Sequence, residues 1–162
     1  MSDLLDSGER RHFCTGAQRD RAAGKGRCDL LPLQEIADFY YEPPSGIIRL
    51  VDSFVQTGDR GDMLEAIRQF SNLAFHDEYT AILDLALQFE DGAVKYDDRN
   101  WEKGMPLSWY IDSGMRHYLK YLRGDKDEPH ERAFVWNMFC ALWTAWNLPE
   151  LNDLPCAENK VE

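Results

Sequence analysis

The chain has 162 residues, of which 29 are acidic and 18 are basic, and its formal net charge is −11. This length predicts one domain with its own core, and the acidic balance excludes nucleic acid as the main ligand, because phosphate contacts need a cationic surface. No stretch reaches the roughly 20 apolar residues that cross a bilayer, and the acidic N-terminus does not resemble a secretory signal, so we expect a cytoplasmic protein without a membrane partner.

Residues 1–30 predict an extended basic arm. Four glycines interrupt this segment, and no helical period persists through it. Six of its side chains are basic, so the rest of the chain is more acidic still. An acidic protein domain needs additional positive charge to bind a polyanionic ligand, and divalent metal ions usually supply it.

From Leu31 onward the apolar spacing turns helical, and no alternating strand pattern appears. Pro106 suits a first helical turn, Gly124 suits a helix end, and Asp127 suits an N-cap. These signals predict an all-α bundle of about five to six helices, followed by a tail at 149–162. The single helical domain would span 31–148, with helices at about 32–42, 45–55, 62–74, 77–93, 106–123 and 127–146.

Two of these helices carry apolar stripes that predict their buried faces. The stripe of the third helix comprises Met63, Ile67, Phe70, Leu73 and Ala74. The stripe of the fourth helix comprises Ile82, Leu85, Ala86, Phe89 and Ala93. The four cysteines are scattered without a CxxC pair, which predicts free thiols.

Carboxylates on the predicted helices mark candidate chemistry. Glu90 lies deep in the fourth helix, and Asp112 lies one turn before Arg116 in the fifth. Asp127 and Glu128 stand at the start of the sixth helix. Three helices thus each offer a carboxylate, and hard oxygen ligands of this kind suit Mg²⁺ or Mn²⁺.

Each of these residues also has a simpler interpretation. Glu90 can belong to a solvated helix face, and Asp112 with Arg116 can form a surface ion pair of little energetic value. The acidic residues before the sixth helix can complement its positive end. His117 and His130 can be structural histidines. Spacing alone leaves these alternatives open.

Specific strings carry a stronger signal than composition. The central strings are FEDGAVKY at 89–96 and DRNWEKG at 98–104. Further strings are YIDS at 110–113 followed by Arg116-His117, then Asp127-Glu128 with His130, then Trp136-Asn137, and in the arm TGAQRD at 15–20 and GKGRCDLLP at 24–32. Together they resemble the dATP/dGTP diphosphohydrolases of phage and prophage, N-terminal domain type, a family related to the MazG-like all-α nucleotide pyrophosphohydrolases.

The resemblance implies metal-dependent hydrolysis of a purine deoxynucleoside triphosphate, dGTP or dATP, to the monophosphate and pyrophosphate. It implies Mg²⁺ or Mn²⁺ as the cofactor and a homo-oligomer, dimer or tetramer, in a bacterial host cell. The chain departs from the family in a long helical segment at about 38–80. It also lacks the ExxE pair of MazG-like helices around Glu90.

The resemblance also implies roles for individual residues. The expected metal ligands are Glu90, Asp112, Asp127 and Glu128. The expected catalytic residues are Glu90, Lys95, Arg116, His117 and His130. Lys95 and Arg116 would stabilise charge on the phosphate, and His117 and His130 would contact phosphate or orient an acidic ligand. The expected substrate-binding residues are Arg19, Lys25, Arg27, Tyr96, Asn100, Trp101 and Asn137. Trp101 can equally be a packing residue of its loop.

A second interpretation belongs to a different class of protein. The helical insertion can have turned an enzyme into a nucleotide-binding or protein-binding module without turnover, because kinship of fold does not guarantee retained chemistry. A third interpretation is a purely structural helical protein. Metal-dependent release of pyrophosphate separates the enzyme from both alternatives.

Overall fold

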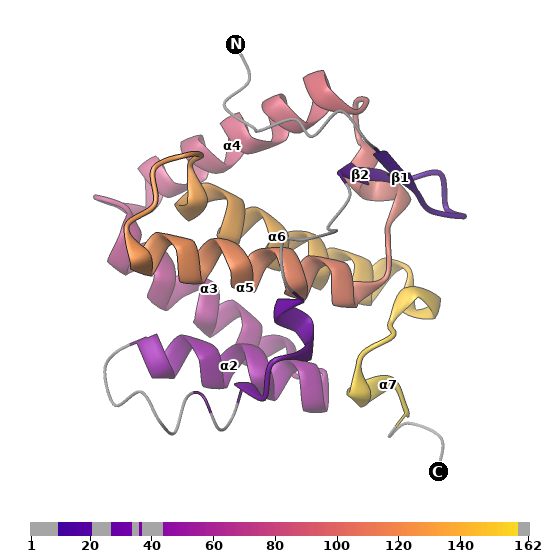
Figure 1. The fold of residues 1–162 in the computed structure, drawn as a ribbon, viewed down its shortest axis with the longest axis horizontal. Coiled ribbons are helices and arrows are strands. Elements are labelled where there is room, and N and C mark those ends of the chain that lie inside the picture. Colours follow the sequence, from indigo (N-terminus) through magenta and orange to yellow (C-terminus); the bar gives the residue numbers. More distant parts are fainter. Residues whose placement is uncertain (1–9, 21–26, 34–35, 37–43, 159–162) are drawn as a thin grey trace.

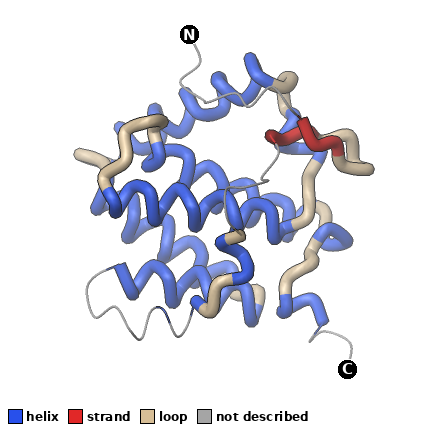
Figure 2. The backbone as a smooth tube through the Cα atoms, in the orientation of Figure 1, coloured by secondary structure: helices blue, strands red, loops and turns tan. Residues whose placement is uncertain are grey.

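Helices make up most of the described chain, and a small hairpin is its one sheet, which confirms the predicted all-α fold (Figure 2). No helix in the described part of the chain is long and apolar enough to cross a membrane. The computed structural model describes residues 10–20, 27–33, 36 and 44–158.

Helices α5 (Leu107–Arg123) and α6 (His130–Asn147) pack against each other at the centre of the fold. Helices α2 (Pro44–Thr57) and α3 (Arg60–Ala74) cover one side of this pair. Helix α4 (Glu78–Lys95) covers the opposite side, so the bundle has three layers (Figure 1).

Side-chain caps and glycines set the helix ends. Asp59 accepts a hydrogen bond from the Gly61 N–H at 2.6 Å, and Asp77 accepts one from the Thr80 N–H at 2.9 Å. Each carboxylate satisfies an amide that the first turn of α3 or α4 leaves without a helical partner. Gly124 ends α5 in the left-handed region with φ 87°, as predicted.

The predicted N-cap of α6 is wrong. Helix α6 begins at His130, and Pro129 occupies the N-cap position without a side-chain hydrogen bond. The Asp127 carboxylate instead accepts from Lys120 Nζ at 2.7 Å and lies 2.8 Å from His130 Nε2. Asp127 therefore joins the end of α5 to the start of α6.

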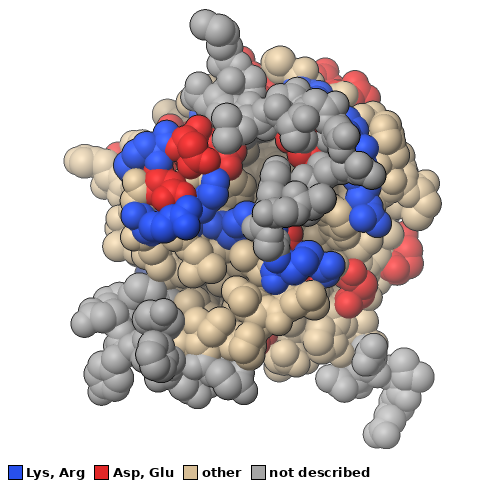
Figure 3. All heavy atoms as spheres, in the orientation of Figure 1, with Lys and Arg blue, Asp and Glu red and all other residues tan. Residues whose placement is uncertain are grey.

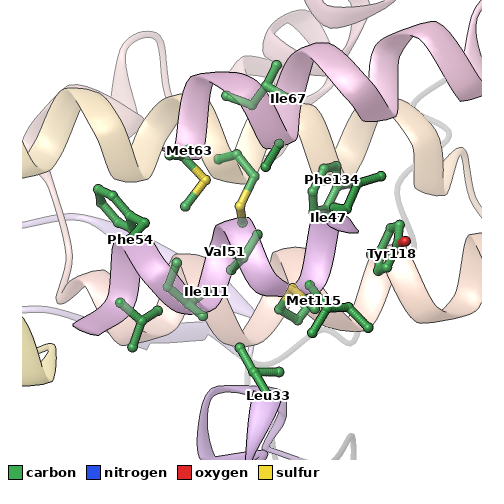
Figure 4. Packing of buried hydrophobic residues seen from close by; sticks show 14 of the residues in the cluster. Leu33, Ile47, Val51, Phe54, Met63, Ile67, Ile111, Met115, Tyr118 and Phe134 are labelled. Carbon is green, nitrogen blue, oxygen red and sulfur yellow. The ribbon is translucent and has the colours of Figure 1, made fainter. Parts of the chain in front are cut away.

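The main hydrophobic core lies between α2, α3, α5 and α6 (Figure 4). Val51 from α2 and Met63 from α3 are fully buried and face Ile111 and Phe134 of the central pair. Burying one such side chain contributes about 1.5–3 kcal/mol. Helices α2 and α3 fall within the segment at about 38–80 that the sequence predicts as an insertion, so this segment supplies one side of the core.

The predicted buried face of α4 is wrong in part. Ala81 and Gln88 are its buried residues, whereas Ile82 is 62% exposed and Ala86 is also exposed. Leu73, predicted to be buried in α3, is exposed as well. Apolar residues occupy more than one face of α4, so the helical period did not identify the face that meets α6.

The N-terminal arm contains a hairpin. Strand β1 (Arg10–His12) pairs antiparallel with β2 (Gln18–Asp20), a pairing that the predicted extended arm did not specify. Three-residue polar strands carry no alternating apolar pattern that a sequence could reveal. The 3-10 helix η1 (Cys28–Leu30) packs against α5. The predicted helix at 32–42 lies largely outside the described residues.

The segment after α6 packs onto the bundle instead of forming the predicted tail. It contains the 3-10 helix η3 (Pro149–Leu151) and the short helix α7 (Pro155–Glu158), which contacts α2. Leu154 and Cys156 are buried in the main core. The four cysteines are free thiols, as predicted.

Candidate active site

A cavity of about 710 Å³ lies between the arm, α4, α5 and the first half of α6. It collects most of the residues that the sequence predicted for the site. Those that line it are Arg19, Glu90, Lys95, Tyr96, Asn100, Trp101, Asp112, Arg116, His117, Glu128 and Asn137. The structure therefore brings together side chains from segments that are far apart in the sequence.

Four predicted residues lie elsewhere. His130 is buried next to the cavity wall, where it contacts His117, and Asp127 lies outside the lining residues. Arg27 is exposed and pairs with Asp29 on the arm, so the structure does not place it at the cavity. Lys25 lies outside the described residues.

The side-chain amide of one asparagine holds the hairpin on the bundle through a pair of hydrogen bonds to the backbone of β2. Asn100 begins the 3-10 helix η2 (Asn100–Lys103) and is buried. Its side-chain oxygen accepts from the Gln18 N–H at 3.0 Å, and its Nδ2 donates to the Gln18 carbonyl at 3.1 Å. Thr15 adds a 2.6 Å hydrogen bond to the carbonyl of Gly104. The Asn100 amide is thus engaged by the arm.

Arg19 of β2 reaches across the cavity to α6. Its Nη2 donates to Asn137 Oδ1 at 2.7 Å, and its guanidinium carbon lies 5.7 Å from the Trp136 ring and 5.9 Å from the Tyr110 ring. Asn137 is buried and donates its own Nδ2 to the Ala133 carbonyl at 2.7 Å. Arg19 is therefore positioned by polar and aromatic contacts together.

Lys95 at the end of α4 is also tied to the arm. Its Nζ lies 2.7 Å from Asp20 of β2, and both side chains are largely buried. Asp20 also pairs with Arg10 at 3.2 Å and contacts the Tyr96 hydroxyl at 3.3 Å. Burial raises the pKa of Tyr96 to about 12, so its hydroxyl stays protonated at neutral pH.

Asp112 anchors the arm from α5. It is 4% exposed, and its Oδ1 accepts from the Cys28 N–H at 2.5 Å. Its other oxygen accepts from Arg116, one turn later on the same helix. Both carboxylate oxygens are thus engaged by protein donors, and the pair is more buried than a surface ion pair.

Two histidines meet where α5 turns into α6. Their Nδ1 atoms are 3.0 Å apart, and His130 Nε2 faces the Asp127 carboxylate. A proton on His130 Nε2 leaves its Nδ1 to accept from His117 when both rings are neutral. Burial, with the neighbouring His130 and nearby cations, holds the pKa of His117 well below its usual value. His117 is therefore neutral at pH 7, with Nε2 as its remaining acceptor.

The same turn holds groups that can bind a metal ion. One group is His117, Glu128 and His130, whose ligand atoms lie within 4.8 Å of one another, and a second contains Asp125, Asp127 and His130. The four predicted metal ligands are therefore not gathered into one cluster. Glu128 and Asp127 belong to separate groups, while Glu90 and Asp112 belong to neither.

Glu90 differs from the other carboxylates of the cavity. It lies on an exposed position of α4 and lines the cavity. Within the described part of the chain, its side chain has no hydrogen-bond or ion-pair partner. Glu128 is held loosely, at 3.7 Å from His117 and 3.9 Å from Lys120. These two carboxylates retain open positions toward a ligand.

Aromatic side chains form part of the cavity wall. Trp101 lies 5.3 Å from Phe89 and 5.0 Å from Trp143, measured between ring centroids. Both interpretations of Trp101 thus find support, because it packs in its loop and also lines the cavity. Trp136 continues this aromatic wall at 6.1 Å from Phe89.

Several lining residues were missed from the sequence. Asp20 lies in the arm string TGAQRD, and Lys120 follows Arg116 by one helical turn, so the string and the spacing offered signals for both. Ser113 likewise lies in the string YIDS, whereas Gln88 carried no such signal. Acidic and basic side chains gather on the side of the molecule where α5 turns into α6 (Figure 3).

The fold and the cavity define an all-α protein with a candidate ligand site that is lined by charged and aromatic side chains. The model of the family described as dATP/dGTP diphosphohydrolase, N-terminal, matches residues 70–154, which is more than half of the chain. The chain belongs to this family. No curated protein and no solved structure matches the chain. The arm, whose strings share the resemblance, lies outside the matched residues.

Proposed function

We propose that the protein hydrolyses a purine deoxynucleoside triphosphate, dATP or dGTP, to the monophosphate and pyrophosphate. The observation that carries the proposal is a single cavity that combines open carboxylates, several cations and an aromatic wall. Carboxylates suit a divalent ion, cations suit phosphate oxygens, and aromatic rings suit a base. The family to which the chain belongs supports the same reaction and substrate class.

The donor set fits a divalent cation. Glu128 has an open oxygen position at the turn between α5 and α6, and Glu90 has one on α4, where both line the cavity. Carboxylate oxygens of this kind suit Mg²⁺ or Mn²⁺. We assign Asp112 to holding Cys28 and Arg116 in place, because it is buried and each of its oxygens already accepts a hydrogen bond. A bound ion would supply Lewis-acid polarisation of the phosphate.

The cations of the cavity would neutralise the triphosphate. Arg116 and Lys120 lie one turn apart on α5, and both line the cavity. Arg19 reaches the same space from the arm. Charge on the phosphate oxygens grows during phosphoryl transfer, and fixed cations stabilise it without reorganisation of solvent. Lys95, already paired with Asp20, would act chiefly by holding the arm.

His117 would handle the proton of the attacking water. It is neutral at pH 7, and its Nδ1 is engaged with His130. The Nε2 atom is then the one that accepts a proton, as in general base catalysis. His130 and Asp127 would orient the ring from behind, because a hydrogen bond at one nitrogen fixes the tautomer of the pair.

The test is release of pyrophosphate from a panel of dNTPs and NTPs, with and without Mg²⁺ or Mn²⁺, followed by chromatography of the products. We expect metal-dependent conversion of dGTP or dATP to its monophosphate. Binding of nucleotide without turnover across the whole panel would replace the proposal by the nucleotide-binding module.

The proposal includes self-association. Tyr79, Leu83, Leu87 and Val94 are exposed large apolar residues on α4. An adjoining apolar pocket of about 560 Å³ is walled mainly by α6 and includes Trp146. Exposed apolar surface of this extent marks an interaction site. A second copy of the chain is the occupant we propose, since two copies of one long apolar strip can bury each other around a twofold axis.

A further inference from the structure

Two polar atoms of the cavity wall lack hydrogen-bond partners. The side-chain oxygen of Gln88 and the indole Nε1 of Trp136 are screened from solvent and bond to no atom of the described residues. Gln88 is only 6% exposed, and both residues line the cavity. A buried polar atom without a partner is unfavourable, so its presence calls for an explanation such as a ligand that supplies the partner.

Both residues line the cavity, and Trp136 belongs to its aromatic wall. Gln88 precedes Phe89 in α4, and the Phe89 ring lies 6.1 Å from the Trp136 ring. Trp136 also lies 6.3 Å from Tyr110 on α5. Tyr110 and His117 are seven residues apart, about 10 Å along the helix axis. Trp136 is thus set apart from the carboxylates and histidines at the turn between α5 and α6, and Arg19 is the cation that lies beside it.

We propose that Gln88 and Trp136 read the edge of the purine base, an inference that rests on the proposed function. The Gln88 amide carries an acceptor oxygen and a donor nitrogen side by side. With the oxygen toward purine position 6, it accepts from the amino group of adenine and donates to N1. Rotated by half a turn, it donates to the oxygen of guanine and accepts from its N1–H. One side chain therefore accommodates both purines.

Trp136 supplies the selection for purines. Its indole nitrogen is a donor only, so it needs an acceptor on the base. Purines carry such an acceptor at N7, whereas pyrimidines have no equivalent atom. Reading of a base by edge hydrogen bonds between aromatic rings is common where proteins bind an unstacked nucleotide.

The test pairs protein variants with substrate analogues. The first pair of substrates is dGTP and 7-deaza-dGTP, which lacks the N7 acceptor. The second is dATP and deoxyribosylpurine triphosphate, which lacks the group at position 6. The variants are Trp136→Phe and Gln88→Leu. Their matched controls are Trp143→Phe, whose ring packs against Trp101 outside the lining of this cavity, and Gln69→Leu in α3, whose amide bonds to Glu65.

We expect the natural chain to prefer each natural substrate over its analogue by about tenfold in kcat/KM, the value of one hydrogen bond. Trp136→Phe should bring the ratio of kcat/KM for dGTP to that for 7-deaza-dGTP close to one. Gln88→Leu should bring the ratio of kcat/KM for dATP to that for deoxyribosylpurine triphosphate close to one. Both controls should keep both ratios. Unchanged ratios in the cavity variants, or no preference in the natural chain, would overturn the inference.

Dissociation constants of the same nucleotides, measured calorimetrically in EDTA, separate this inference from the proposed function. One outcome is that the natural nucleotides bind more tightly than their analogues, that the variants remove this preference, and that no nucleotide is hydrolysed with any metal. This outcome overturns the proposed reaction and supports base reading. Hydrolysis with ratios that the variants leave unchanged overturns base reading and supports the reaction.

Discussion

Arg19 and Asn137 lie 118 positions apart and are joined by a 2.7 Å hydrogen bond between Nη2 of the guanidinium and Oδ1 of the amide. This bond connects β2 to the middle of α6. Asn137 is 2% exposed, so its oxygen has little access to water as an alternative partner. The arm and the bundle therefore depend on each other at this contact.

Replacing Asn137 by Ala should lower the free energy of unfolding by about 1–3 kcal/mol, because Arg19 loses a largely desolvated partner. Urea denaturation followed by circular dichroism measures the change. Asn147→Ala is the matched control, since Asn147 also donates to the carbonyl four residues earlier but is exposed and accepts nothing from the arm. Equal losses in the two variants would show that the Arg19 contact contributes nothing.

Glu90→Gln should reduce turnover of the purine nucleotide by roughly 100-fold or more, since even supporting groups of a metal site contribute 10–100-fold. The fold should remain intact, because Glu90 lies on an exposed position and contributes no contact to the core. The measurement is kcat with saturating Mn²⁺, beside a thermal melt. Glu78→Gln, in the first turn of the same helix, should leave turnover unchanged. Retained activity in Glu90→Gln would remove this residue from the site.

The metal-free protein should lose stability as the pH falls below about 6.5. Burial holds the pKa of His117 below its unfolded value of 6.5, so the unfolded chain binds a proton that the folded chain does not. The free energy of unfolding therefore rises with pH up to about 6.5 and then levels off for this group. Urea titrations at several pH values should show a shallower slope for His117→Asn. The exposed His76→Asn should keep the original slope.

Leu83→Asp should dissociate the oligomer, because a charge in the apolar strip of α4 opposes burial against a second copy. Leu83 is 68% exposed in the single chain. Light scattering coupled to gel filtration gives the mass directly. Leu30→Asp is the control, since Leu30 is 70% exposed but lies on η1, away from α4. A natural chain that is monomeric at all concentrations would contradict the proposed self-association.

Gly114→Ala should destabilise the bundle by about 1–3 kcal/mol through overpacking. The added methyl group would lie 2.1 Å from Met138 Cε and 3.2 Å from Asn137 Cβ, both on α6. Gly92→Ala in α4 meets nothing within 4 Å and should stabilise by about 0.5–1 kcal/mol. Opposite signs in the two unfolding titrations would confirm the close approach.

Much of the fold follows from local signals in the sequence. Asp59, Asp77 and Gly124 act where a cap or stop residue should, because such residues depend on their immediate neighbours alone. Asp59 was not predicted as the cap of α3, because the predicted start of this helix was two residues later than the observed start at Arg60. The outer face of α4 could not be predicted, because apolar residues lie on several faces of this helix and the helical period does not single out one of them.

The candidate site followed from strings more than from periodicity. The strings at 15–20 and 98–104 form the two sides of one interface, through Gln18 and Asn100. A string match cannot separate residues that hold the arm from residues that face a ligand. Asp112 is the clearest example, since only its three-dimensional contacts show that both of its oxygens are engaged.

The two faces of the α5–α6 pair differ in the side chains that they carry. Toward α2 and α3 they present apolar side chains, and among the described residues neither of those helices lines the cavity. Toward the arm and α4 they present the polar wall. Substitutions at pocket residues that make no contact with the arm need not disturb the apolar packing on the far side, so ligand preference can change while that core is retained.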